Sequence, residues 1–217
     1  MTIEAFAGGA FAENTYLLGR EDRGEAVVVD PGAAAEQALR SARERGLEVR
    51  AILLTHAHLD HVEGIPAVRA AFPDAPIHLH PGDLVLYDAV QAQAAAFGMQ
   101  APRLPPIDAE LEHGRRLRLL DLDIDVRFTP GHAPGHVLFH LPGHGVALVG
   151  DVVFAGSVGR TDLPGGDWRT LFESIRAHVL TLPDETRLLT GHGPETTVGH
   201  ERRSNPFLVP HYGGELA

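Results

Sequence analysis

Four apolar runs in this chain end in the same way, with a potential metal ligand within a few residues of the end of each run. These ligands are His56, His132, Asp151 and His192. Glycine directly precedes three of the four, and it allows the backbone to turn tightly enough for a side chain to reach a shared centre. In open α/β sheets, ligands bind beyond the carboxyl ends of the strands. The pattern therefore predicts sheets that present several loops to one site.

The first of these loops is the richest in ligands. Residues 55–61 read Thr-His-Ala-His-Leu-Asp-His and follow residues 51–54, an apolar run typical of a buried strand. In extended backbone, residues two apart point the same way, whereas a helix that begins near residue 60 turns its side chains toward a neighbouring point. The two ligand pairs, His56 with His58 and Asp60 with His61, thus predict two metal ions a few ångströms apart. A polar loop of hydrogen-bonded histidines is the simpler alternative, but such dense ligands at a strand end disfavour it.

Asp30 has two interpretations. It ends another apolar run, residues 26–29, in the turn signal Asp30-Pro31-Gly32. Its carboxylate can cap the helix predicted over residues 33–45. It can instead orient a metal-binding histidine through a hydrogen bond. The sequence leaves both open.

Strands and helices alternate along the rest of the chain without a linker, so we expect a single domain over residues 1–217. Strands are predicted over residues 2–6, 15–18, 26–29, 51–54, 77–80, 117–120, 124–128, 137–139, 146–149 and 187–190. Further helices are predicted from the first ligand loop to residue 72, over 83–101, over 168–180 and near the end of the chain. Residues 83–101, with the prolines that follow up to residue 106, form either a lid over the site or a packed surface helix.

Composition excludes several classes of function. The chain has no cysteine, which rules out disulfides, thiolate metal sites and a cysteine nucleophile. A net charge of −11 argues against nucleic acid as a partner. The first residues carry no basic segment and no apolar run is long enough to span a bilayer, so we expect a cytoplasmic protein without a membrane partner.

These residues, in this order, resemble the metallo-β-lactamase superfamily, and the resemblance covers essentially the whole chain. It implies an α/β fold, an αββα sandwich of two mixed β-sheets flanked by helices, with a binuclear site. By matching position, the first metal ion would be held by His56, His58 and His132. The second would be held by Asp60, His61 and His192, with Asp151 bridging both. Asp60 and Asp151 are therefore the expected catalytic carboxylates.

Within the superfamily, the sequence is most similar to the hydroxyacylglutathione hydrolase (glyoxalase II) branch in its short bacterial form. The matching segments are residues 129–132, 150–154, 156–162, 191–194 and 201–207. Longer members carry a further C-terminal helical region and a tyrosine soon after the last ligand histidine. This chain ends at Ala217 and has Pro194-Glu195-Thr196 after that histidine. We therefore expect weaker binding of glutathione substrates than in the longer enzymes.

The resemblance implies a metal-dependent hydrolase that acts on a small-molecule thioester. A water shared by two divalent cations loses a proton near neutral pH, and the bridging hydroxide attacks a carbonyl. A thiolate leaves readily, since the free thiol pKa is ~8.5. Zinc is the expected ion, with iron and manganese as alternatives that suit the same ligands. Arg160 is a candidate for binding a substrate carboxylate, and its alternative is a structural ion pair.

Three other functions remain open. The phrase Gly159-Arg160-Thr161-Asp162 also occurs in the related persulfide dioxygenases, which use one iron held by residues that match His56, His132 and Asp151. A lactonase or other ester hydrolase would share the hydrolytic mechanism. A non-catalytic binding protein is the third, and it is disfavoured because all seven ligand positions are filled.

The remaining histidines are not predicted to bind metal. His136 repeats the Pro-Gly-His phrase of the second loop but falls at the start of a predicted strand, which indicates a structural role or one that supports a ligand. Those without ligand-like neighbours are His113, His140, His144, His178, His200 and His211.

Overall fold

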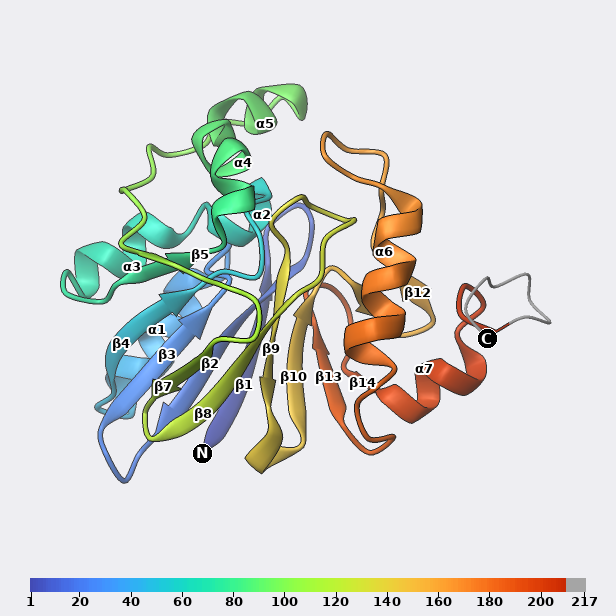
Figure 1. Cartoon of the computed structure of the whole chain (residues 1–217). Coiled ribbons are helices and arrows are strands. Elements are labelled where there is room, and N and C mark those ends of the chain that lie inside the picture. Colours follow the sequence, from blue (N-terminus) through green and yellow to red (C-terminus); the bar gives the residue numbers. More distant parts are fainter. Residues whose placement is uncertain (210–217) are drawn as a thin grey trace. The chain divides into compact units, whose positions relative to one another are not determined.

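The computed structural model describes residues 1–209, so His211 lies outside the described residues. The chain divides into two compact units. Figure 1 labels the helices and strands of both units. Unit 1 comprises Met1–Leu111 with Arg118–Leu122, and unit 2 comprises Glu112–Leu117 with the chain from Asp123 onward. The single domain expected from the sequence stays a prediction.

Unit 1 contains a mixed sheet with the strand order β1-β2-β3-β4-β5-β6. The first three strands are antiparallel neighbours, and β3, β4, β5 and β6 run parallel to one another. Its strands are β1 (Thr2–Gly8), β2 (Glu13–Arg20), β3 (Glu25–Val29), β4 (Glu48–Leu53), β5 (Ile77–Leu79) and β6 (Ala109–Glu110). The strands predicted at residues 2–6 and 15–18 are present and pair as an antiparallel hairpin. The buried strands predicted at residues 26–29 and 51–54 are also confirmed, and the second ends one residue earlier than predicted.

The helices of unit 1 are shorter than predicted. Helix α1 (Ala35–Glu44) buries Ala35, Ala38, Leu39 and Ala42, the helical spacing of one apolar face, against the sheet. The helix predicted from the first ligand loop to residue 72 is two helices, α2 (Leu59–Val62) and α3 (Ile65–Ala71), which meet at Gly64. Residues 83–101 likewise form α4 (Leu84–Asp88) and α5 (Val90–Ala96) after the short helix η1 (Pro81–Asp83).

The second mixed sheet has the order β14-β13-β10-β9-β8-β7. It belongs to unit 2 except for the end of β7 and the first residue of β8, which fall within Arg118–Leu122. Strands β10 and β13 are parallel, whereas β9 is antiparallel to both β8 and β10. The strands are β7 (Arg116–Leu119), β8 (Leu122–Phe128), β9 (Val137–Leu141), β10 (Val146–Gly150), β13 (Arg187–Thr190) and β14 (Thr196–Thr197). The short helix η2 (Pro142–His144) connects β9 and β10, and β11 (Val153–Phe154) and β12 (Ser157–Val158) form a separate two-stranded ribbon.

The helix predicted over residues 168–180 changes type along its length. It begins as α6 (Trp168–Ser174), capped by Asp167, and continues as a π-helix, η3 (Ile175–Val179). Leu171, Phe172, Ile175 and Val179 form an apolar stripe at helical spacing and are all buried in the core with residues of β9, β10 and β13. Helix α7 (Val198–Ser204) follows β14.

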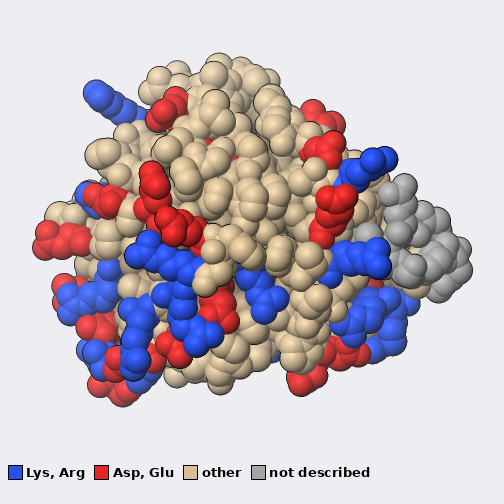
Figure 2. Space-filling model, viewed as in Figure 1, with Lys and Arg blue, Asp and Glu red and all other residues tan. Residues whose placement is uncertain are grey.

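The predicted fold class is confirmed: the chain forms two mixed β-sheets flanked by helices. Basic and acidic side chains are interspersed on the face shown in Figure 2 rather than gathered by sign. Within residues 1–209, no helix is long and apolar enough to cross a membrane.

Candidate metal centre

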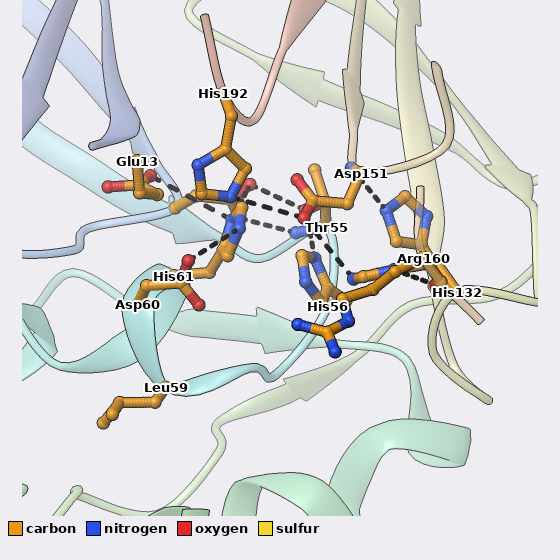
Figure 3. Close-up of polar contacts among 12 residues, drawn as sticks. Glu13, Thr55, His56, Leu59, Asp60, His61, His132, Asp151, Arg160 and His192 are labelled. Atoms are coloured by element: carbon orange, nitrogen blue, oxygen red, sulfur yellow. Dashed lines mark hydrogen bonds and ion pairs between the residues drawn. The ribbon is translucent and has the colours of Figure 1, made fainter. Parts of the chain in front are cut away.

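The loop after β4 gathers three buried imidazoles in unit 1 (Figure 3). The ring of His56 lies 4.8 Å from that of His58 and 4.0 Å from that of His61, measured between centroids. His58 is still extended and directly precedes α2, whose first turn contains Asp60 and His61. The predicted change from strand-like to helical backbone within this loop is therefore confirmed.

Asp30 and Thr55 fix the tautomer of His56. The Thr55 amide donates to Asp30 Oδ1 at 2.7 Å, and the Thr55 hydroxyl donates to Asp30 Oδ2 at 2.6 Å. That hydroxyl has one hydrogen, so at its 3.0 Å contact with His56 Nδ1 it accepts a hydrogen bond from the ring. The neutral imidazole of His56 therefore carries its lone pair on Nε2.

The same carboxylate orients His61. His61 Nδ1 lies 3.1 Å from Asp30 Oδ2, so the ring donates from Nδ1 and carries its lone pair on Nε2. The capping interpretation of Asp30 is wrong, because α1 begins after Ala34 and has no side-chain cap. Asp30 has a φ of +47°, a left-handed conformation that aspartate tolerates better than most residues. Its position after a parallel strand lets it reach the neighbouring loop.

Glu13 is a further buried carboxyl group near this loop that sequence reasoning did not identify. It is 1% exposed, and its Oε1 lies 4.0 Å from His61 Nδ1. Its Oε2 accepts a hydrogen bond from Thr15 at 3.2 Å. Burial raises the pKa of Glu13 well above its usual value, against the opposing effect of His61. The only sequence signal was a polar start to an otherwise apolar strand.

Two side chains from the segment between β5 and β6 hold the backbone around His58. The Ala57 amide donates to the buried carboxylate of Asp83 at 2.8 Å. Gln93 accepts from the Leu59 amide at 3.0 Å and donates to the Ala57 carbonyl at 3.0 Å. A second bond from Gln93 to the Leu86 carbonyl, at 2.8 Å, ties α5 to α4. Part of residues 83–106 therefore packs against the ligand loop and holds its backbone by hydrogen bonds.

Replacing Gln93 with leucine is expected to loosen this support. The substitution preserves size but removes three hydrogen bonds, leaving the Leu59 amide and Ala57 carbonyl without these partners. We expect the free energy of unfolding to fall by about 1–3 kcal/mol and the affinity for metal to fall about tenfold. Denaturant titration and metal binding measure the two effects. The exposed Gln91→Leu is the control, and equal values for the two variants would contradict the proposed support.

In unit 2, Gly131 positions the next histidine. It has a φ of +125°, and a Cβ there would lie 2.2 Å from the backbone nitrogen of Leu171, so only glycine fits. The following residue, His132, is buried and donates from Nδ1 to the Arg160 carbonyl at 2.8 Å. Because a carbonyl can only accept, the neutral ring carries its lone pair on Nε2.

Asp151 lies between two imidazoles of unit 2 (Figure 3). Its Oδ2 is 3.4 Å from Nε2 of His132 and 3.4 Å from Nε2 of His192. Close packing at Gly159 contributes to this geometry, since a Cβ there would lie 1.9 Å from the Asp151 carbonyl oxygen. Unit 2 thus brings its three predicted ligands together.

His136 holds the backbone of Asp151. The Asp151 amide donates to His136 Nε2 at 3.1 Å, so the ring donates from Nδ1 to the Thr129 hydroxyl at 3.0 Å. Both ring nitrogens of this fully buried histidine are therefore engaged within the protein. The prediction left open whether His136 is structural or supports a ligand, and its bond to the Asp151 amide favours the second because Asp151 is itself a predicted ligand.

Arg160 contributes through its backbone in this structure. Its exposed guanidinium forms a two-point ion pair with Asp162, at 2.7 and 2.8 Å, while its carbonyl orients His132. The ion pair lowers the pKa of Asp162 to about 2. A role of the Arg160 side chain in substrate binding stays a prediction.

The donor sets of both units fit divalent cations. Unit 1 contributes imidazole nitrogens and the Asp60 carboxylate, and unit 2 contributes two imidazoles and the Asp151 carboxylate. Three of the histidines are held in the tautomer that a metal ligand needs, with the other nitrogen bonded to the protein. Neutral imidazoles and carboxylates suit zinc, iron and manganese alike.

Two mixed sheets flanked by helices, with histidine and aspartate clusters in the loops after the strands, define a metallo-hydrolase of the α/β class. The model of the metallo-beta-lactamase superfamily matches residues 8–192. The chain belongs to this superfamily.

Relatives agree over nearly the whole chain. The hydroxyacylglutathione hydrolase GloC of Haemophilus influenzae is 39% identical over 214 residues, which cover 96% of this chain and 98% of that protein. The solved structure of TTHA1623 in a di-iron-bound form is 43% identical with a TM-score of 0.86, covering 94% of this chain and 100% of the other. That of the BLEG-1 B3 metallo-beta-lactamase is 37% identical with a TM-score of 0.87, covering 96% and 100%.

Proposed function

We propose that this chain is a binuclear thioester hydrolase of the hydroxyacylglutathione type. The observation that carries the proposal is the set of hydrogen bonds that fix three histidines with Nε2 as the basic nitrogen, beside two carboxylates in the ligand positions. Two divalent cations, with zinc expected and iron or manganese as alternatives, would be held by His56, His58, Asp60, His61, His132, Asp151 and His192. In this proposal the two ligand groups act as one centre within a single domain.

The reaction places few demands on the protein beyond binding and orientation. When bound, two divalent cations lower the pKa of a shared water toward neutrality and polarise the substrate carbonyl. His136 holds the backbone of Asp151, which would be a ligand of the ions, and Asp60 is held by the first turn of α2. A thioester suits such a site because its thiolate leaves near neutral pH without a proton donor. An amide would need a group that protonates the departing nitrogen.

The relatives support parts of this proposal. The 39% identity to GloC favours a thioester of hydroxyacylglutathione type, and the di-iron form of TTHA1623 favours two metal ions. The Arg160 guanidinium would meet a substrate carboxylate by exchanging its partner Asp162, since both side chains are exposed. A cytoplasmic location and a small-molecule partner stay predictions.

The test is a substrate panel on the metal-loaded protein. We expect S-lactoylglutathione to be hydrolysed with release of a thiol that a colorimetric reagent detects, and metal removal by a chelator to abolish the activity. The panel adds an acyl-CoA thioester, a homoserine lactone and a chromogenic cephalosporin. Turnover of the lactone or the cephalosporin alone would keep the metal chemistry and overturn the thioester assignment. Oxygen uptake with glutathione persulfide would instead support the dioxygenase.

A further inference from the structure

A cavity in unit 2 is lined by residues that take no part in the proposed metal centre. It has a volume of about 370 Å³, and its charged lining comes from the segment before β7, from β7 and β8 and from the π-helix η3. Those lining residues are His113, Arg116, Asp125, Arg127 and His178. π-Helical turns are rare and are frequent at functional sites.

The hydrogen bonds of His113 make it a donor toward a ligand. Its Nδ1 accepts the backbone amide of Phe128 at 3.1 Å, so the neutral ring carries its hydrogen on Nε2. Such a ring cannot offer an Nε2 lone pair to a metal ion, but it can donate a hydrogen bond to an acceptor. The ring of His178 lies 5.1 Å away, measured between centroids.

The two arginines supply positive charge, and their contacts within the protein do not use all of their N–H donors. Arg127 donates through Nη1 to the His178 carbonyl at 3.0 Å and lies 3.5 Å through Nη2 from His140 Nδ1. Arg116 donates through Nε to Asp125 at 2.6 Å. A guanidinium has five N–H donors, so each of these arginines has more donors than these contacts use. With neutral histidines, the two lining arginines and one lining aspartate leave a net charge of +1, in a chain whose net charge is −11.

The pKa values of two histidines near the cavity, His178 and His140, are lowered by their surroundings. Burial, with smaller contributions from His113 and Arg127, lowers the pKa of His178. His140, behind Arg127, likewise has its pKa lowered by burial first and by Arg127 second, against Asp125. These surroundings favour the neutral forms of His178 and His140, and a bound anion would favour their protonation.

We propose that this cavity binds a small oxyanion, a phosphate or carboxylate group with at least two acceptor oxygens, against the His113 and His178 rings and the Arg127 guanidinium. Arginine forks and protonated histidines are the donors that such groups favour. A cation is disfavoured by the two arginines and by the tautomer of His113. The site does not depend on the proposed hydrolase activity.

The test follows the histidine ring signals of the zinc-loaded protein by NMR during titration with inorganic phosphate, with sodium acetate as the carboxylate arm. Saturable shifts of the His113 and His178 signals are expected at pH 6, with affinity falling about tenfold in His178→Asn. Acetate keeps the same charge between pH 6 and pH 8, so its affinity is expected to be lower at pH 8, where the histidines are neutral. Reading these two rings distinguishes the cavity from anion binding at the metal ligands. The arm that saturates at the lower concentration identifies the favoured oxyanion.

The matched control is His144→Asn, an exposed histidine of unit 2 outside the cavity lining, which should bind as the unchanged protein does. His113→Gln serves as a second variant at an exposed position and should also weaken binding. The absence of a saturable shift with millimolar concentrations of either anion would overturn the proposal. The proposal would also be overturned if His178→Asn and His113→Gln bound the anion with the same affinity as the unchanged protein.

Discussion

The His192→Ala variant is expected to bind close to one metal equivalent instead of two and to lose hydrolytic activity by about 100-fold or more. His192 is assigned with Asp60 and His61 to the second ion, and its Nε2 lies 3.4 Å from the bridging candidate Asp151. The His192 side chain is 27% exposed, so its removal should leave the stability of the fold nearly unchanged. Elemental analysis and thioester hydrolysis measure the two effects on the same sample.

The exposed His200→Ala is the control for this variant, since His200 lies in α7 outside the ligand set. Full hydrolytic activity in His192→Ala would contradict the two-metal mechanism directly. In a persulfide dioxygenase, the single iron would keep the ligands matching His56, His132 and Asp151, and oxygen uptake would survive the substitution. The variant therefore separates the two functions as well as testing the ligand.

The Asp30→Asn variant is expected to weaken both metal sites at once, with the affinity of each site for metal falling by about 10–100-fold. Asparagine is nearly isosteric and can still accept the Thr55 amide. Its amide nitrogen cannot accept from the Thr55 hydroxyl or from His61 Nδ1. His61 therefore loses the group that orients it, and the Thr55 hydroxyl that contacts His56 loses the acceptor that fixes its hydrogen. Competition with a chromogenic chelator should show two weakened sites.

Thr55→Val provides the matched comparison for Asp30→Asn. Valine removes the hydroxyl that links Asp30 to His56 but leaves the hydrogen bond between Asp30 and His61 in place. We expect only the site that contains His56 to weaken. If Asp30→Asn affected one site alone, or if Thr55→Val weakened both equally, the shared role of Asp30 would be wrong.

The sequence predicted the strands and the loops that follow them because these depend on local signals. Apolar runs such as residues 26–29 and 51–54 mark buried strands, and the dense ligands of residues 55–61 mark the loop. It missed the breaks in the helices. Gly64 lies between α2 and α3, and a Cβ there would lie 2.2 Å from the Gly32 carbonyl oxygen, so the position requires glycine. A contact between residues so far apart in the sequence is not visible in a local sequence pattern.

The groups that support the candidate ligands were harder to predict than the ligands themselves. Asp30 and Thr55 are 25 residues apart, and Gln93 reaches the Ala57 carbonyl across 36 residues. Glutamine in an alanine-rich helix gives no local sign of such a hydrogen bond. Glu13 was missed for the same reason, since only the packing of β2 shows that its carboxyl group is buried beside His61.

The hydrogen bond between His132 and residue 160 has an evolutionary consequence. His132 is oriented by a main-chain carbonyl, which every amino acid supplies, whereas the Arg160 side chain is exposed and pairs with its near neighbour Asp162. Mutation at position 160 can therefore alter the charge and reach of that side chain while the histidine keeps its hydrogen bond. If the Arg160 side chain binds substrate as proposed, substrate preference is free to change at this position while His132 keeps the group that orients it.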